Sequence, residues 1–102
     1  MQKIKILSAQ QQFAVSLGKL VKHQRAQSMA QGELATRTGL SRNTISAIEN
    51  GKSVSIEALF AVLAQLNLLH LLAEPVNGQL AEVDKRQQRK VRKPKPELSN
   101  DF

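Results

Sequence analysis

The chain has 102 residues, enough for one small domain, and its 15 Lys and Arg against 8 Asp and Glu give a formal net charge of +7. It contains no cysteine, which excludes a disulfide framework and a thiolate metal site. It shows no run of about 18 apolar residues and no charged-then-apolar leader, so we expect a cytoplasmic protein without a membrane partner. The basic balance favours polyanions, although charge alone fits a ribosomal or membrane-surface protein equally well.

The chain is expected to begin with an extended arm, residues 1–7, and then a helix. Ser8 and Gln11 have the spacing of a capping box, in which the hydroxyl and the amide each bond to the other residue's backbone N–H. Apolar residues then recur at helical spacing up to about Arg25, namely Phe13, Leu17, Leu20 and Val21. Three cations lie on the other faces of this helix, where they either contact phosphates or stay solvated: Lys19, Lys22 and Arg25.

Residues 31–51 contain two short helical patterns around a glycine-containing turn. Leu34 and Ala35 give the first pattern an apolar side, and Gly39 supplies the break, because glycine takes positive φ without steric cost. Ser41 then stands where an N-cap is expected, since its hydroxyl can accept a bond from a backbone N–H in the first turn.

The second of these helices separates an apolar face from a small polar face. Ile45 and Ile48 lie on one side, and Asn50-Gly51 ends the helix. At about 100° per residue, Asn43, Ser46, Ala47 and Asn50 fall on the opposite side, with Arg42 and Thr44 on the flanks. Arg, Asn and Thr suit base edges in a major groove, so direct readout is expected from Arg42, Asn43, Thr44 and Ser46.

Together these residues resemble the Cro/C1-type (XRE) helix-turn-helix of phage and bacterial repressors, closely over residues 30–51 and loosely over 8–66. The resemblance implies an all-α, four- to five-helix DNA-binding domain over residues 8–67. It assigns Gln31 to a phosphate contact that also braces the reading helix, and it gives Glu49 a structural role inside the domain. The expected DNA-binding residues are Gln31, Ser41, Arg42, Asn43, Thr44, Ser46, Asn50 and Lys52.

After this motif, Ser55 is expected to cap a helix whose apolar stripe closes the core, namely Ile56, Leu59, Phe60, Leu63 and Leu66. An almost wholly apolar run, residues 68–73, follows and stops at Glu74-Pro75. So short a run with a proline stop predicts a strand, and an exposed apolar strand needs a partner. We therefore expect a homodimer formed by pairing this strand with its copy, through Leu68, Leu69, Leu71 and Leu72. Continuation of the preceding helix is the alternative.

A repressor-type helix-turn-helix followed by a leucine-rich strand resembles the HipB family of antitoxins, as do the opening Gln2-Lys3-Ile4 and residues 20–25. This resemblance implies a dimer that binds an inverted-repeat operator in double-stranded DNA, represses its own operon and holds a HipA-type Ser/Thr kinase toxin. The tail is longer and more basic than the family leads us to expect. A freestanding phage or host repressor without a toxin is the alternative, and a nonspecific chromatin or RNA-binding protein is a third reading.

Residues 74–102 are expected to form a flexible basic tail, with seven Lys and Arg and no acid in residues 85–95. The tail could add phosphate contacts, order against a partner protein, for instance as a helix over 79–92, or remain solvated. His23 and His70 are the only histidines, and no phosphate-binding glycine loop or catalytic carboxylate pair is present. We therefore expect no catalysis, no cofactor and no metal.

Overall fold

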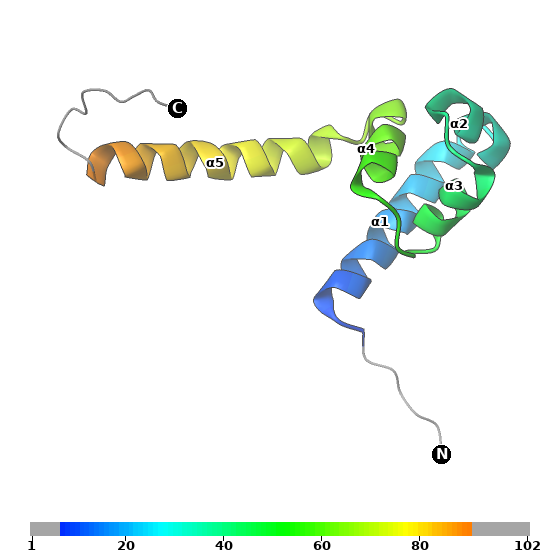
Figure 1. The fold of residues 1–102 in the computed structure, drawn as a ribbon, viewed down its shortest axis with the longest axis horizontal. Helices are drawn as coiled ribbons and strands as arrows, with labels where there is room; N and C mark the ends of the chain where they lie inside the picture. The colour runs from blue at the N-terminus through cyan, green and yellow to red at the C-terminus, as the bar shows by residue number, and fades with distance from the viewer. Residues whose placement is uncertain (1–6, 91–102) are drawn as a thin grey trace, which may run out of the picture. The chain divides into compact units, whose positions relative to one another are not determined.

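The computed structural model describes residues 7–90, and these form five helices without a strand (Figure 1). The chain divides into two units, Met1–Leu69 and His70–Phe102, which are described separately here. The helices of the first unit are α1 (Ala9–Ala26), α2 (Gln31–Thr38), α3 (Arg42–Glu49) and α4 (Ile56–Gln65), and the second unit contains α5 (His70–Lys90). The prediction of an all-helical domain is thereby confirmed for the described part of the chain.

The predicted capping box at the start of α1 is confirmed. The backbone N–H of Gln11 donates to Ser8 Oγ at 3.1 Å, and the backbone N–H of Ser8 donates to Gln11 Oε1 at 3.0 Å. Two donors that a helix start otherwise leaves unpaired are thus satisfied by local side chains. Within the arm, only Leu7 is described; residues 1–6, with the Gln2-Lys3-Ile4 phrase, lie outside the described residues.

Left-handed residues end three helices of the first unit, α2, α3 and α4. Gly39 after α2 and Gly51 after α3 have φ of 74° and 71°, as their place in the sequence predicts. Asn67, with φ of 60°, does the same after α4. The N–H of Leu68 then donates to the carbonyl of Leu63 at 2.8 Å, and both side chains are buried, which is the bonding and the apolar contact of a Schellman motif.

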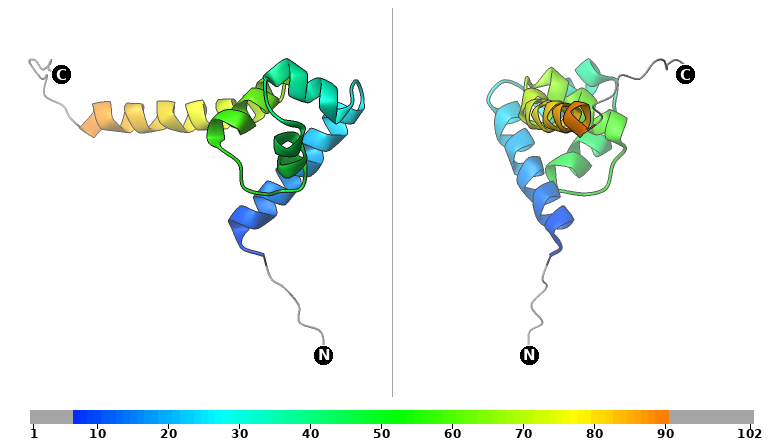
Figure 2. Two further views of the ribbon diagram at one scale, coloured as in Figure 1. Left: turned by 45° about the vertical axis from the view of Figure 1, so that its right-hand side comes forward. Right: turned by 90° about the vertical axis from the view of Figure 1, so that its left-hand side faces the viewer.

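The core of the first unit lies where α1, α2 and α4 surround α3 (Figure 2). Helix α3 packs against each of the other three, and α2 also packs against α4. Leu34 and Ala35 of α2 and Ile45 and Ile48 of α3 are buried, as predicted. The fully buried side chains that fill the centre are Leu34, Ile45, Leu63, Val21 and Val62. Helix α3 therefore lies at the centre of the packing of the first unit and also contributes exposed residues to its surface.

The buried faces of α1 and α4 differ from the predicted stripes. On α1, Phe13 and Leu20 are exposed, and the buried positions are Gly18, Val21 and Arg25. On α4, Ile56 and Phe60 are exposed, whereas the buried positions are Ala58, Val62 and Leu63. In both helices the buried face includes small residues, because a glycine or alanine allows the helices to approach closely. The predicted stripes are therefore confirmed in part: Val21, Leu63 and Leu66 are buried, but selecting the largest apolar side chains turned each stripe toward the exposed side of its helix.

The predicted dimerisation strand over residues 68–73 is wrong. Leu68 and Leu69 belong to the connection after α4, and Leu71 and Leu72 belong to the first turn of α5. The alternative of a continuous helix is also wrong, because the left-handed Asn67 separates α4 from α5. Pro75 does not stop α5, although it lies inside the helix and its missing N–H removes the backbone bond to the carbonyl of Leu71.

The predicted flexible tail over 74–102 is corrected as well. Residues 74–90 are helical, whereas residues 91–102 lie outside the described residues, so the 79–92 helix is present as far as Lys90. No single helix in residues 7–90 is long and apolar enough to cross a membrane; only α4 and α5 counted together reach that length and composition.

Candidate nucleic-acid interface

Helix α3 is held at its start by Ser41. The hydroxyl of Ser41 accepts from the backbone N–H of Thr44 at 3.0 Å and lies 2.9 Å from the hydroxyl of Thr44. Ser41 itself is in the extended region, with φ of −80° and ψ of 157°, as an N-cap must be. The predicted cap is confirmed. It holds the backbone of the first turn of α3 and so fixes the positions from which the side chains of this turn project.

The exposed part of the first turn carries Arg42 and Asn43. Thr44 and Ser46 are half-buried, and Thr44 already shares its hydroxyl with Ser41. At the other end of the helix, the side-chain amide of Asn50 donates to the carbonyl of Ser46 at 2.9 Å. Arg42 and Asn43 therefore have the largest freedom to reach a base edge, whereas the hydroxyl of Thr44 and the amide of Asn50 also serve α3 itself.

The far end of α3 is fixed by a buried ion pair that joins it to α1. Nε of Arg25 lies 2.5 Å from Oε2 of Glu49, and the guanidinium also donates to Oε1 at 3.1 Å. The remaining guanidinium nitrogen of Arg25, Nη1, donates to the carbonyl of Met29 at 2.9 Å. Arg25 was predicted to lie on a polar outer face of α1, and that prediction is wrong: the residue is only 9% exposed.

Gln31 completes this cluster from the start of α2. Its side-chain amide donates to Oε1 of Glu49 at 3.0 Å, so it braces the reading helix as the family resemblance implied. Glu49 is 6% exposed and receives bonds from both neighbouring helices, in agreement with the structural role expected for it. The second part of the expectation for Gln31, a phosphate contact, stays a prediction.

Charge and hydrogen bonding keep Glu49 ionised despite its burial. Burial alone raises the pKa of this carboxyl, but hydrogen bonds from Arg25 and Gln31 and the positive charges of Arg25 and Lys22 outweigh it. The pKa of Glu49 therefore lies below its ordinary value of 4.5. The carboxylate neutralises Arg25, which leaves other cations of the domain to face an anionic ligand.

Gly18 allows α1 and α3 to approach each other closely beside this ion pair. A Cβ at position 18 would lie 2.4 Å from the carbonyl oxygen of Ile48 and 2.8 Å from that of Glu49. These are backbone atoms and cannot move aside as a flexible side chain could. Sequence reasoning missed both Gly18 and the Arg25–Glu49 pair; the only local signal was a glycine inside an otherwise regular helical pattern.

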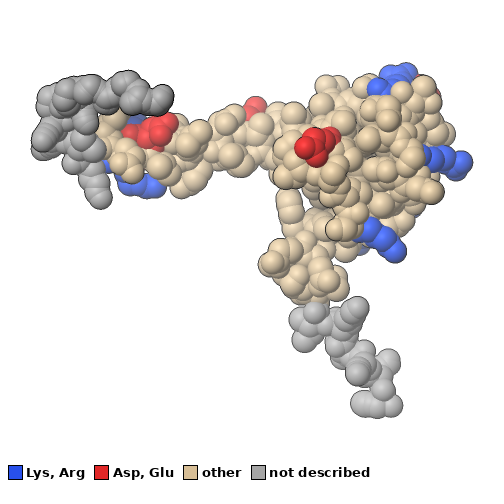
Figure 3. Space-filling model, viewed as in Figure 1, with Lys and Arg blue, Asp and Glu red and all other residues tan. Residues whose placement is uncertain are grey.

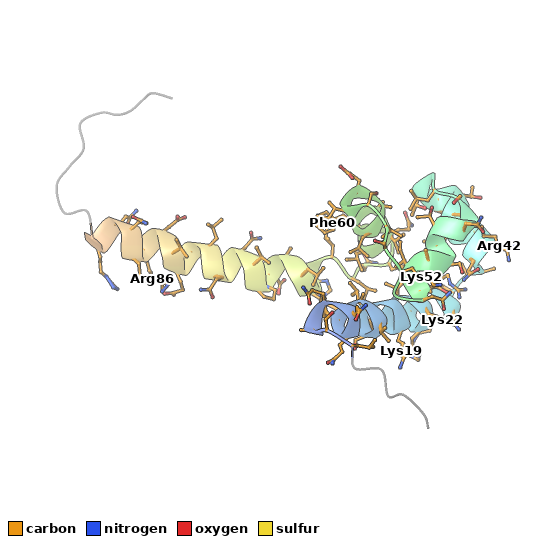
Figure 4. All side chains as sticks on the ribbon, turned by 60° about the horizontal axis from the view of Figure 1, so that its bottom comes forward. Lys19, Lys22, Arg42, Lys52, Phe60 and Arg86 are labelled. Atoms are coloured by element: carbon orange, nitrogen blue, oxygen red, sulfur yellow. The ribbon has the colours of Figure 1, made fainter. Side chains whose placement is uncertain are left out.

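The first unit has a positive surface once its internal pairs are counted. Arg25 pairs with Glu49, and Arg37 pairs with Glu33 at 2.7 Å on the surface of α2. The cations that remain without a carboxylate partner in residues 7–69 are Lys19, Lys22, Arg42 and Lys52, all exposed (Figure 4). In the space-filling view the basic groups visible on one face of the first unit lie apart from one another, separated by uncharged surface (Figure 3).

A shallow groove runs along the exposed side of α3 and extends the site beyond the predicted residues. One wall is formed by α3 and by Leu40 in the turn before it, and the other by the connection that leads into α4 and by Ala58 of α4. The lining residues are Leu40, Asn43, Thr44, Ala47, Ser53, Val54, Ser55 and Ala58. Ser53 and Ser55 were not predicted as part of the interface, although they lie one and three positions after Lys52; both line the groove with Asn43 and Thr44.

The predicted DNA-binding residues therefore fall into two groups. Seven of them lie on α3 or within three residues of its ends, namely Ser41, Arg42, Asn43, Thr44, Ser46, Asn50 and Lys52. Gln31 is set apart, half-buried and bonded to Glu49. The predicted dimerisation residues are not part of this group. The arrangement is that of a short polar helix on a rigid support, a geometry that can enter a major groove.

Of the comparisons of this chain with known proteins, the comparison with family models finds a match. The family model HTH_3, described as helix-turn-helix, matches residues 21–71, which is half of the chain. The matched segment begins within α1 and contains all of α2, α3 and α4. No curated protein and no solved structure matches the chain.

Proposed function

Because the chain belongs to the Cro/C1-type helix-turn-helix family of DNA-binding transcription regulators, we propose that it is a sequence-specific repressor that binds an inverted-repeat operator as a homodimer. The observation that carries the proposal is the exposed first turn of α3, where Arg42 and Asn43 project from a helix clamped at both ends. Arg suits the O6 and N7 atoms of guanine, and Asn suits N6 and N7 of adenine.

The support around α3 explains how such a small surface could discriminate between sequences. Ser41 fixes the first turn, and the Arg25–Glu49–Gln31 cluster fixes the last residue of the helix. Readout by hydrogen bonds requires donors held in place before binding, since ordering them on the DNA would cost affinity. Lys19, Lys22 and Lys52 supply charge that can contact phosphates, which contributes affinity without sequence information.

Selection of random duplex DNA by the purified protein at about 0.15 M salt tests this proposal, because nonspecific phosphate binding is weakened at that ionic strength. The expected result is an inverted repeat whose half-site centres lie about 34–36 Å apart, or a multiple of this distance. Binding at low salt without enrichment of any site would overturn the proposal and favour a nonspecific chromatin or RNA-binding protein.

Two alanine variants distinguish a side chain that contacts a base from one that contributes only positive charge to binding. Arg42→Ala is expected to cost about 1–3 kcal/mol of binding free energy and to relax one base position of the selected site. Lys19→Ala is the matched control, since it also removes one exposed cation. It should weaken binding equally for all sequences and reduce the slope of affinity against salt by about one unit. A uniform loss with Arg42→Ala would contradict its role as a reader.

The role of a HipB-like antitoxin is the second candidate. It is supported by the resemblance over residues 20–25 and ranks second because the leucine-rich strand that also supported it is instead part of α5 and its connection. In this candidate the protein represses its own operon and holds a HipA-type Ser/Thr kinase. Co-purification of a kinase from cells that express the neighbouring genes tests it, and consistent absence of a kinase leaves the freestanding repressor. Neither candidate assigns a catalytic role to the chain.

A further inference from the structure

Helix α5 has an apolar stripe along one side. Val76, Leu80 and Val83 follow one another at intervals of four and three residues, and they are 63%, 55% and 38% exposed. Ala73 precedes them by three residues on the same side. At about 100° per residue these four side chains fall within about 80° of arc. The intervals are those of a helix that packs lengthwise against another helix.

The charged residues of α5 lie away from this stripe. Asp84 and Arg86 fall on its two flanks, and Glu74 and Lys85 fall on the opposite side of the helix. Gln87, the next residue on the stripe, is uncharged. A helix of 21 residues that contains Pro75 and Gly78 has little intrinsic stability, so its order depends on packing of its apolar side.

Charge is distributed unevenly along α5. Its first fifteen residues, 70–84, contain three acids and no Lys or Arg, whereas residues 85–90 contain four Lys and Arg and no acid. In Figure 3 the visible charged groups of α5 gather toward its C-terminal half. Two α5 helices side by side in parallel would bring both basic ends together. An antiparallel pair separates the two basic ends and places each of them beside the first turns of the other helix, which carry Glu74 and no Lys or Arg, so it lowers the electrostatic energy.

From this stripe and this charge distribution we propose that α5 is a dimerisation helix, whose apolar stripe packs against the same stripe of a second copy of the chain in antiparallel orientation. Such a contact is twofold symmetric, so each helix presents the same surface to the other. The interface deepens the proposed function, which needs a homodimer, and replaces the strand that the sequence led us to expect. It is tested without DNA, so its failure and the failure of the operator proposal are distinguishable.

Sedimentation velocity of the full chain over the micromolar range is the test, with one substitution on the stripe and a matched control beside it. Leu80→Lys puts a charge into the middle of the stripe and is expected to weaken dimerisation by at least about tenfold. Ala81→Lys adds the same charge one residue further on, away from the stripe, and should change the dimerisation constant by no more than about threefold. Both positions are exposed, and circular dichroism should show the same helix content for both variants.

The relative orientation of the two α5 helices can be measured separately, from the distance between two spin labels. Because the chain contains no cysteine, Gln88→Cys can carry a single label. With a rise of 1.5 Å per residue, labels in an antiparallel dimer lie about 20–30 Å apart, against about 10–15 Å in a parallel dimer. A wild-type chain that stays monomeric, or a Leu80→Lys variant that dimerises like the wild type, would overturn the interface. A short label distance would overturn the antiparallel arrangement. A dimer that enriches no DNA site would leave the interface intact and reject the operator proposal.

Discussion

Arg25 and Glu49 lie 24 residues apart in the sequence, yet Nε of the one is 2.5 Å from Oε2 of the other. The pair joins the last turn of α1 to the last residue of α3, and Gln31 adds a bond from the first residue of α2. Three helices of the DNA-binding domain are thus tied together at one buried carboxylate. The orientation of α3 therefore depends on buried residues that lie away from its exposed face.

Removal of the Glu49 carboxylate should be strongly destabilising. Glu49→Ala leaves the guanidinium of Arg25 buried without a counter-charge, which costs about 3–5 kcal/mol of unfolding free energy. The matched control is Glu33→Ala, which breaks the solvent-exposed pair with Arg37 on α2 and should cost no more than about 1 kcal/mol. Urea unfolding of the two variants measures both values. Equal losses would contradict the structural role of the buried pair.

The stability of the domain should depend on pH through Glu49. Its pKa in the folded protein lies below the ordinary value of 4.5, so the carboxylate stabilises the fold at pH values above 4.5. This contribution is lost as the pH falls below 4.5 and through the folded pKa, because the unfolded state then takes up a proton more readily than the folded state does. The difference in unfolding free energy between wild type and Glu49→Gln should therefore shrink as the pH is lowered from neutrality to below 4.5. A difference that stays constant over this range would show that the carboxylate charge contributes nothing.

Any residue larger than glycine at position 18 should destabilise the domain. In Gly18→Ala the new methyl group meets the carbonyl oxygens of Ile48 and Glu49, so α1 and α3 must separate, at a cost of at least about 2 kcal/mol. Gly32→Ala is the control, since nothing lies within 4 Å of a Cβ at that helical position. It should stabilise the domain by about 0.4–1 kcal/mol, because alanine loses less backbone entropy on folding. Thermal unfolding should thus show shifts of opposite sign, and a stable Gly18→Ala variant would refute the close approach.

Ser41 can be tested as a cap separately from any contact with DNA. Ser41→Ala should cost about 1 kcal/mol of unfolding free energy, because the backbone N–H of Thr44 loses its acceptor. Ser41→Asn should keep nearly wild-type stability, because asparagine is an equally good N-cap. Any loss of affinity for the selected operator in Ser41→Asn therefore reports a contact between Ser41 and DNA. Wild-type stability of Ser41→Ala would contradict the capping role.

The sequence correctly indicated the features that arise within a few residues of the chain. The capping box of Ser8 and Gln11, the cap at Ser41 and the glycine stops at Gly39 and Gly51 each involve neighbours up to three or four positions apart. The buried face of α3 was also predicted, because Ile45 and Ile48 are its only large apolar residues. The family followed from the same local pattern.

The prediction of a strand over residues 68–73 was wrong, and the cause also lies in nearby residues of the sequence. Residues 68–73 were interpreted as a separate apolar run that ends before Pro75. The helical periodicity continues past the proline through Val76, Leu80 and Val83, and a longer window would have included it. A proline inside a helix removes one backbone bond and crowds the carbonyl four residues earlier, but α5 continues past Pro75.

By itself, then, the sequence determined the helix starts and stops of the DNA-binding motif and the polar residues it presents, because hydrogen bonds between near neighbours fix them. Only the tertiary structure decided which sides of α1 and α4 are buried, that Gly18 lies against the backbone of α3, and that Arg25 turns inward to Glu49. Those outcomes depend on how closely helices distant in the sequence approach one another. Close packing places a small residue such as Gly18 or Ala58 beside the large apolar ones on the buried face, and a buried carboxylate requires a buried cation beside it.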